Sequence, residues 1–145
     1  MNIDFSQMTT AEARTAMAVQ AARIRARAAL LGVIEAAAEA ITGRVPLPEK
    51  LSWGSKEVAA RAVLAGAASA EQEAMIAGEA AQTGEAVKAL AGRVIRNADA
   101  YRGHVALLTG LRRHTEALID AAQSEAQVDT ALAAATARLS GLRAG

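Results

Sequence analysis

Alanine is the feature that most constrains this chain, since 40 of its 145 residues are Ala. Alanine has the highest intrinsic helix propensity, and its small side chain lets helices approach closely. The chain holds only one Phe, one Trp and one Tyr, so few large side chains can fill a core. Burial stabilises by roughly 25 cal/mol per Å² of apolar surface, so we expect a lone copy to be only marginally stable. The composition favours long helices packed closely on one another, within the chain or between subunits.

The charge balance argues against a dedicated nucleic-acid binder. The chain carries 16 basic and 15 acidic residues, for a net charge of +1, whereas such binders are strongly basic on one face. Arg23, Arg25 and Arg27 form a local basic cluster, but no aromatic residue is interleaved with them. We interpret this cluster as a solvated helix face, with phosphate binding as the alternative.

The sequence predicts neither a secretion signal nor a membrane segment. The first ten residues contain Asp4 and no Lys or Arg, so the positive region of a signal peptide is missing. The most apolar run, residues 28–41, is too short to span a bilayer and carries Glu35 and Glu39. The chain has no Cys, which excludes disulfides and thiolate metal ligands.

Caps and helix breakers predict an all-α fold, an elongated helical bundle with long coiled-coil-like helices. Thr9-Thr10-Ala11-Glu12 has the form of a capping box, in which a hydroxyl and a carboxylate satisfy the free N–H groups of a helix start. Both prolines and the single Trp fall in one segment, which we interpret as a linker. We therefore expect four parts: an N-terminal arm 1–8, a long N-terminal helix 9–43, a Pro/Trp linker 44–54 and a C-terminal helical region 55–145.

Within the C-terminal region the sequence predicts four helices. Ser55 is expected to open a short helix that ends before Gly66. Ser69 and Ser124 each begin a further capping box, with Gln72 and Gln127 three residues later. The remaining long helix is expected over residues 85–123, because Thr83-Gly84 breaks the chain before it. No alternating strand pattern is present.

Two apolar stripes have coiled-coil-like spacing. The first consists of Met17, Ala21, Ile24, Ala28, Leu31 and Ala38. The second has Val87, Val94, Tyr101 and Leu108 at every seventh position, with Ala91, Ala98, Val105 and Ile119 between them. We expect the first stripe to cover part of the 85–123 helix within the chain. The second is predicted to be the main oligomerisation element, with a monomeric antiparallel bundle as the alternative.

No catalytic, cofactor or metal site is expected. His104 and His114 are the only histidines, and ten residues of helix separate them by about 15 Å, too far to share a metal. No phosphate-binding glycine loop or nucleophile motif is present. Trp53 is predicted to be substantially buried and to join the two halves of the chain, with a ligand platform as the alternative. We expect no enzyme activity.

The arm and the second stripe supply the candidate interface. Ile3, Phe5 and Met8 are apolar and precede any helix signal, so we expect the arm to dock on another chain. The complete candidate interface is Ile3, Phe5, Met8, Trp53, Val94, Tyr101, Val105 and Leu108.

Several runs of the chain resemble small α-helical proteins of the tail region of tailed bacteriophages and prophages. The resembling runs are Ile3-Asp4-Phe5, Thr10-Ala11-Glu12-Ala13-Arg14, Trp53-x-x-Lys56-Glu57-x-Ala59-Ala60, Leu90-Ala91-x-x-Val94-Ile95-x-x-Ala98-x-x-Tyr101, Leu108-x-x-x-Arg112 and Ile119-Asp120-Ala121-Ala122. The Trp-x-x-Lys-Glu run and the Leu-Ala…Tyr run are the most specific. The chain departs from this pattern by inserting residues 69–84.

The resemblance implies a non-catalytic structural role in a phage tail, as a helical adaptor or fibre-associated virion protein. Implied partners are other tail proteins and further copies of this chain, with a trimer favoured from the habits of tail attachments. Nucleic acid, membrane and cofactors are not expected as partners. The alternative is an assembly chaperone that holds another tail protein and stays out of the particle. Either protein would be made in the bacterial host cytoplasm.

Overall fold

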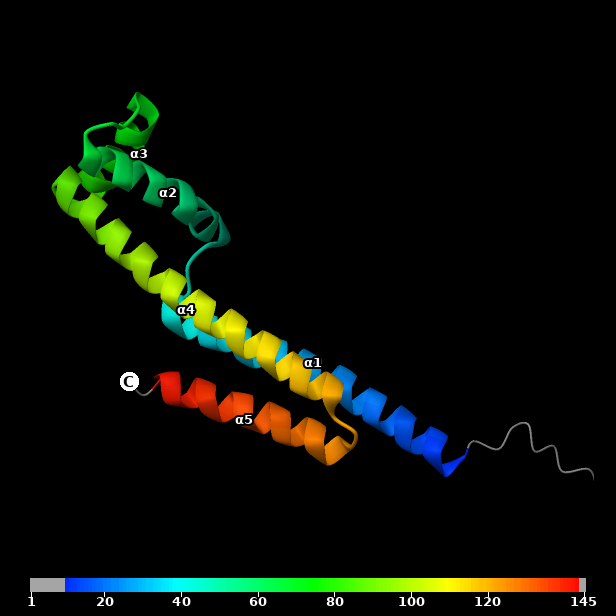
Figure 1. The fold of residues 1–145 in the computed structure, drawn as a ribbon. Helices are drawn as coiled ribbons and strands as arrows, with labels where there is room; N and C mark the ends of the chain where they lie inside the picture. The colour runs from blue at the N-terminus through cyan, green and yellow to red at the C-terminus, as the bar shows by residue number, and fades with distance from the viewer. Residues whose placement is uncertain (1–9, 144–145) are drawn as a thin grey trace, which may run out of the picture. The chain divides into compact units, whose positions relative to one another are not determined.

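A computed structural model describes residues 10–143, and all the regular structure in this range is helical. The all-α prediction is confirmed. The helices are α1 (Ala11–Thr42), α2 (Leu47–Ala65), α3 (Ala70–Thr83), α4 (Val87–Ala121) and α5 (Glu125–Arg143), shown in Figure 1. None of these helices combines the length and the apolar character needed to cross a membrane.

Helix α1 spans Ala11–Thr42, within the predicted range 9–43, and Thr10 caps its first turn. The Thr10 hydroxyl accepts a hydrogen bond from the backbone N–H of Ala13 over 3.1 Å, so Thr10 satisfies a donor of the first turn. The predicted cap, Thr9, lies outside the described residues. The helix ends at Thr42 because Gly43 takes a left-handed conformation with φ of 72°.

The linker predicted over residues 44–54 was wrong in its second half, because α2 already begins at Leu47. Pro46 occupies the N-cap position and Pro48 the first turn. Proline fits there because the first N–H groups of a helix have no partner within it. Trp53 therefore lies inside a helix and not in a loop. Both prolines start this helix.

Ser55, predicted to open a short helix, lies in the middle of α2, so that prediction was wrong. The caps of α3 and α5 follow the sequence more closely. The Ser69 hydroxyl accepts from the N–H of Gln72, and the Gln72 side chain accepts from the N–H of Ser69, which confirms this capping box. At the start of α5, the N–H of Gln127 donates to the Ser124 hydroxyl over 3.3 Å. The Gln127 side chain, however, accepts from the N–H of Gln123, one residue earlier than the pattern predicts.

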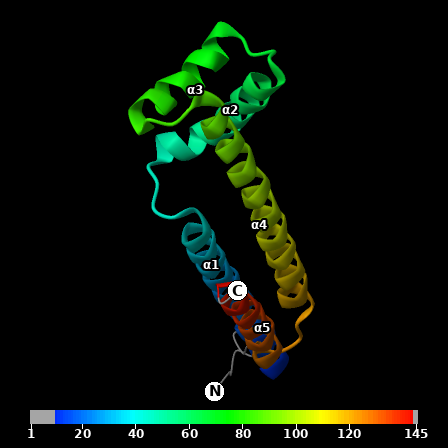
Figure 2. The same ribbon diagram turned by 90° about the vertical axis from the view of Figure 1, so that its left-hand side faces the viewer.

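The described residues divide into two compact units, and α4 contributes to both. The second unit, Ile41–Ala106, contains α2, α3 and the first part of α4 (Figure 2). Each of the three helices contributes two buried residues to its core. They are Ala59 and Ala60 from α2, Ile76 and Ala80 from α3, and Leu90 and Ala91 from α4. Alanine at four of these six positions lets the three helices lie close together.

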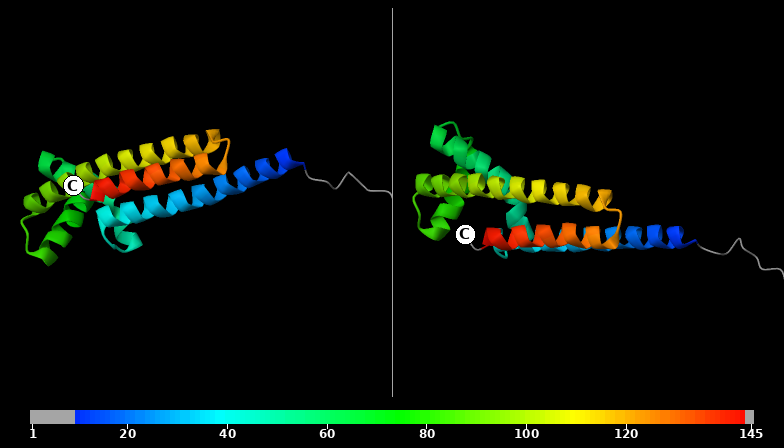
Figure 3. Two further views of the ribbon diagram at one scale, coloured as in Figure 1. Left: turned by 90° about the horizontal axis from the view of Figure 1, so that it is seen from below. Right: turned by 60° about the horizontal axis from the view of Figure 1, so that its bottom comes forward.

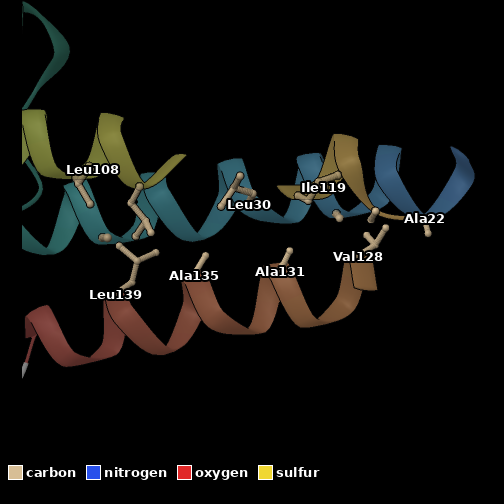
Figure 4. Close-up of a cluster of buried hydrophobic side chains, with 12 residues drawn as sticks. Ala22, Leu30, Leu108, Ile119, Val128, Ala131, Ala135 and Leu139 are labelled. Atoms are coloured by element: carbon tan, nitrogen blue, oxygen red, sulfur yellow. The ribbon is translucent and has the colours of Figure 1, made fainter. Parts of the chain in front are cut away.

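The first unit contains α1, the last part of α4 and α5, which lie alongside one another in Figure 3. Figure 4 shows its core, where Leu30 of α1 and Ile119 of α4 are completely buried opposite alanines of α5. The buried cluster consists of Ala22, Ala26, Leu30, Ala37, Leu108, Leu111, Ile119, Ala122, Val128, Ala131, Ala135 and Leu139. This unit joins segments from the two ends of the described chain.

Candidate interaction surfaces

Helix α1 has two apolar faces, and the one that packs on α4 and α5 is not the predicted stripe. The buried positions are Val19, Ala22, Ala26, Leu30 and Ala37. Each residue of an α-helix turns about 100°, so Ala26 lies about 180° around α1 from Met17. The prediction that the Met17–Ala38 stripe covers α4 within the chain was therefore wrong for its three large members. The alanine-rich face is the one that allows the close approach.

The face opposite the core exposes large apolar side chains at every seventh position. Met17 is 68% exposed, Ile24 61% and Leu31 48%. Ala21 and Ala28 lie between them and are also exposed. We name Met17, Ala21, Ile24, Ala28 and Leu31 the α1 stripe. A helix that is apolar on opposite sides is typically buried on both, and only one side of α1 is buried by this chain.

The three arginines interpreted as a solvated face instead join α1 to the connection between α4 and α5. Arg23 donates from Nη2 to the carbonyl oxygen of Ala122 over 2.8 Å, at the end of α4. That carbonyl lacks a partner within the helix, and a guanidinium supplies one. The prediction of a purely solvated face was wrong for Arg23, which is half-buried.

Arg25 and Arg27, which follow Arg23 along α1, form ion pairs. Arg25 lies 3.6 Å from Glu125 at the start of α5, and Arg27 pairs with Asp120 near the end of α4. Exposed pairs of this kind contribute little energy individually. Together with Arg23, however, they fix the position of the α4–α5 connection along α1. Alanine packing alone would fix that position poorly, because many alanines present similar surfaces.

A second exposed apolar stripe lies on α2. Leu51 is 74% exposed and Val58 59%, with exposed Leu47 one turn before Leu51. The spacing of four and seven residues places the three on one side of the helix. We name Leu47, Leu51 and Val58 the α2 stripe. The sequence interpretation missed it because residues 44–54 were assigned to a linker, where helical spacing is not sought.

Trp53 contacts Tyr101 within the second unit. The two rings meet edge to face, with centroids 5.4 Å apart and planes at 84°, a favoured aromatic geometry. Trp53 is half-buried and lies outside the buried core cluster. It joins α2 to α4, both within residues 41–106, so the prediction that it joins the two halves of the chain was wrong.

Four charged groups on the same two helices, α2 and α4, form a network of ion pairs. Glu57 accepts hydrogen bonds from Arg61 over 2.8 Å and from Arg102 over 2.6 Å. Asp99 accepts from Arg61 over 2.7 Å and also from Arg102. The hydrogen bonds from Arg102 and then Arg61 lower the pKa of the Glu57 carboxyl below its ordinary value of 4.5. The same contacts raise the pKa of both guanidinium groups. These ion pairs connect α2 to the middle of α4.

Some of the remaining candidate interface residues pack within the chain, and others are exposed. Leu108 is only 6% exposed and belongs to the core of the first unit. Val94 packs partly buried against the core of the second unit, while Tyr101 and Val105 stay partly exposed. Ile3, Phe5 and Met8 lie outside the described residues. The second sequence stripe is thus buried within the chain at Ala91, Leu108 and Ile119, and its role in oligomerisation stays a prediction for the exposed positions.

His104 and His114 are both exposed, and no metal-ligating cluster of three His, Asp or Glu side chains forms within residues 10–143. Comparisons of this chain with protein-family models, curated proteins and solved structures find no match.

Proposed function

We propose that this protein is a structural or assembly component of a bacteriophage tail, acting as a helical adaptor or fibre-associated virion protein without catalytic activity. The resemblance of the Trp53-x-x-Lys56-Glu57 run and the Leu90-Ala91…Tyr101 run to small tail-region proteins supports the assignment to a tail. The two runs lie on α2 and α4 of one unit, where Trp53 contacts Tyr101 and Glu57 pairs with Arg102.

One observation carries the assembly role: each unit presents a row of large, exposed apolar side chains along one helix. The large side chains of the α1 stripe recur every seven residues, and those of the α2 stripe lie on one side of their helix. Monomeric soluble proteins rarely expose contiguous apolar patches, which typically mark interaction sites. Burial of these side chains against other helices would supply the apolar area that an alanine-rich core lacks. The protein therefore gains stability in an assembly.

The assembly proposed here is a coiled-coil-like one, an elongated helical bundle built from several copies and from other tail proteins. Coiled coils bury apolar residues at spacings of three and four, the spacing of the α1 stripe. The arm 1–8, with Ile3, Phe5 and Met8, is proposed as a second contact to a neighbouring chain. The preference for a trimer rests on the resemblance alone.

The second candidate is a chaperone that holds another tail protein during assembly and stays out of the particle. The exposed stripes favour it equally, because a holding surface is also apolar. Mass spectrometry of purified tailed particles from the strain that encodes this chain separates the two. We expect the chain at a fixed, multiple copy number per particle. Its absence from particles, together with its recovery on an unassembled tail protein, would establish the chaperone instead.

A further inference from the structure

We propose that the α1 stripe is a self-association surface, on which two copies of this chain pair through antiparallel α1 helices centred on Ile24. This inference rests on the homo-oligomer part of the proposed function and specifies its contact. The exposed side chains of Met17, Ile24 and Leu31 are evenly spaced, with Ile24 in the middle. Antiparallel pairing about Ile24 places Met17 of each copy against Leu31 of the other, and Ile24 against itself.

The charges at the two ends of the stripe decide the direction of pairing. Arg14 precedes the stripe and Glu35 follows it, and both are exposed. Neither forms an ion pair within the described chain: the ion pairs of α1 involve other residues. In an antiparallel pair centred on Ile24, Arg14 of one copy lies beside Glu35 of the other, within about one residue along the axis.

A two-fold axis repeats every contact, since residue i meets j and j meets i. The pair therefore forms two Arg14–Glu35 contacts, one at each end. Parallel pairing would instead place Arg14 beside Arg14 and Glu35 beside Glu35, and like charges at an interface are unfavourable. A parallel dimer or trimer through α1 would carry this repulsion at every pair of neighbours.

The arginines near the centre do not oppose the pairing. Arg25 and Arg27 flank Ile24 and would approach their own counterparts across the axis. Arg25, however, is paired with Glu125 and Arg27 with Asp120 of the same chain. Each copy thus brings the Arg25 and Arg27 ion pairs to the centre, and Arg14 and Glu35 stand at the ends of the stripe, where they meet opposite charges.

The small residues of the stripe permit close contact. Ala21 and Ala28 lie between the large side chains and are exposed. A Cβ built on Gly32, one residue past Leu31, has no atom within 4 Å. Large and small residues alternate along the stripe, so the large side chains of one copy can insert beside the alanines of the other, as knobs into holes.

Ile24→Glu in the full chain tests the surface, with mass measured by light scattering and sedimentation over a range of concentrations. We expect a dimer for the unmodified chain. Ile24→Glu should raise its dissociation constant by about 100-fold, as for a central interface residue. The matched control is Met75→Glu on α3, exposed, apolar and outside both stripes, which should leave the dimer intact. Unchanged helical circular dichroism shows that both variants fold.

Cysteine cross-linking tests the direction, because the chain has no natural Cys. Ile24→Cys should form a disulfide-linked dimer under mild oxidation. Met17→Cys should not link to itself, because the two positions lie about 21 Å apart along the antiparallel axis. A mixture of Met17→Cys and Leu31→Cys chains should link. Self-linked Met17→Cys would overturn the antiparallel arrangement.

Charge exchange supplies the last measurement. Arg14→Glu should weaken the dimer, and Arg14→Glu combined with Glu35→Arg should restore it. An oligomer that resists Ile24→Glu but is lost with Val58→Glu on the α2 stripe would overturn the α1 surface and leave the homo-oligomer standing. A chain that stays monomeric would overturn both, while the tail assignment is decided separately by mass spectrometry of particles.

Discussion

The two units contain the same kinds of residue but are assembled differently. The second unit is one continuous segment, Ile41–Ala106, whose three helices follow one another along the chain. The first unit brings α1 together with α5 and the end of α4, across the whole intervening segment. Closing that longer loop costs additional chain entropy. The comparison teaches that helices adjacent in sequence, as in the second unit, can pack through a core of mostly small residues. The first unit, which joins helices from the two ends of the chain, also uses larger side chains and specific polar contacts.

The polar contacts differ in the same way. In the second unit, charged groups form a network on the surface, where Glu57 and Asp99 share Arg61 and Arg102. In the first unit, Arg23 reaches a backbone carbonyl at the end of α4 from a half-buried position. Exposed ion pairs contribute little, whereas a hydrogen bond from a charged group in a partly buried site contributes more. We therefore expect the first unit to depend more on single residues.

The largest expected effect is that of Leu30→Ala. Leu30 is completely buried in the core of the first unit, opposite helices from the other end of the chain. The loss of its side chain should lower the free energy of unfolding by about 3 kcal/mol. Hydrogen exchange should show lost protection in α5 and retained protection in α3. The neighbouring Leu31→Ala, at an exposed position, is the control and should change unfolding of the monomer by less than about 1 kcal/mol.

Equal loss of protection in α3 would contradict separate behaviour of the two units. It would mean that α4, which contributes to both units, unfolds as one element, so that loss of stability in the first unit also destabilises the second.

A smaller effect is expected for Arg23→Ala. The change removes the donor to the Ala122 carbonyl and should cost about 2 kcal/mol, as for a hydrogen bond that involves a charged group. Chemical denaturation followed by circular dichroism measures it. Arg113→Ala, at an exposed position of α4 outside the proposed dimer surface, serves as the control. A cost for Arg23→Ala no larger than that control would show that the α4–α5 connection is held by packing alone.

A change of similar kind in the second unit should be milder. Ser69→Ala removes the hydroxyl that accepts from the N–H of Gln72 and leaves the backbone N–H of residue 69, which donates to the Gln72 side chain. The expected cost is about 1 kcal/mol, seen as faster hydrogen exchange in the first turn of α3. Ser140→Ala, whose hydroxyl donates to a carbonyl within α5, should have little effect. Similar costs for both variants would remove the special role of the cap.

The sequence predicted the helices well because their signals are local. Ser69, Gly43 and Gly84 act within a few residues, and the structure places helix ends at or beside them. The start of α2 was missed because Pro46 and Pro48 were interpreted as breakers, although the first turn of a helix accepts proline.

The surfaces were harder to predict because α1 has two apolar faces. Heptad spacing identified Met17, Ile24 and Leu31 correctly as a stripe, but it does not say which face the same chain covers. Alanines at 22 and 26 give a weak apolar signal in the sequence, yet they form the contact that allows close packing. The pairing of Arg23 with a carbonyl about a hundred positions away leaves no local pattern at all.

The smallest expected effect concerns pH and the surface network of the second unit. Contacts with Arg102 and Arg61 lower the pKa of Glu57 in the folded chain, so the folded state binds this proton less readily than the unfolded state. The stabilisation is therefore fully present at neutral pH and is lost as the pH falls below 4.5, through the lowered pKa. Glu57→Gln should remove this part of the acid sensitivity.

The readout is thermal unfolding of the unmodified protein and the Glu57→Gln variant between pH 3 and pH 7. Glu85→Gln is measured for comparison, because Arg93 lowers the pKa of Glu85 as well. Glu57 contacts two arginines from different helices whereas Glu85 contacts one just along the chain, so the Glu57 variant should flatten the acid dependence more. Equal flattening by the two variants would mean that joining α2 to α4 adds nothing beyond a local ion pair.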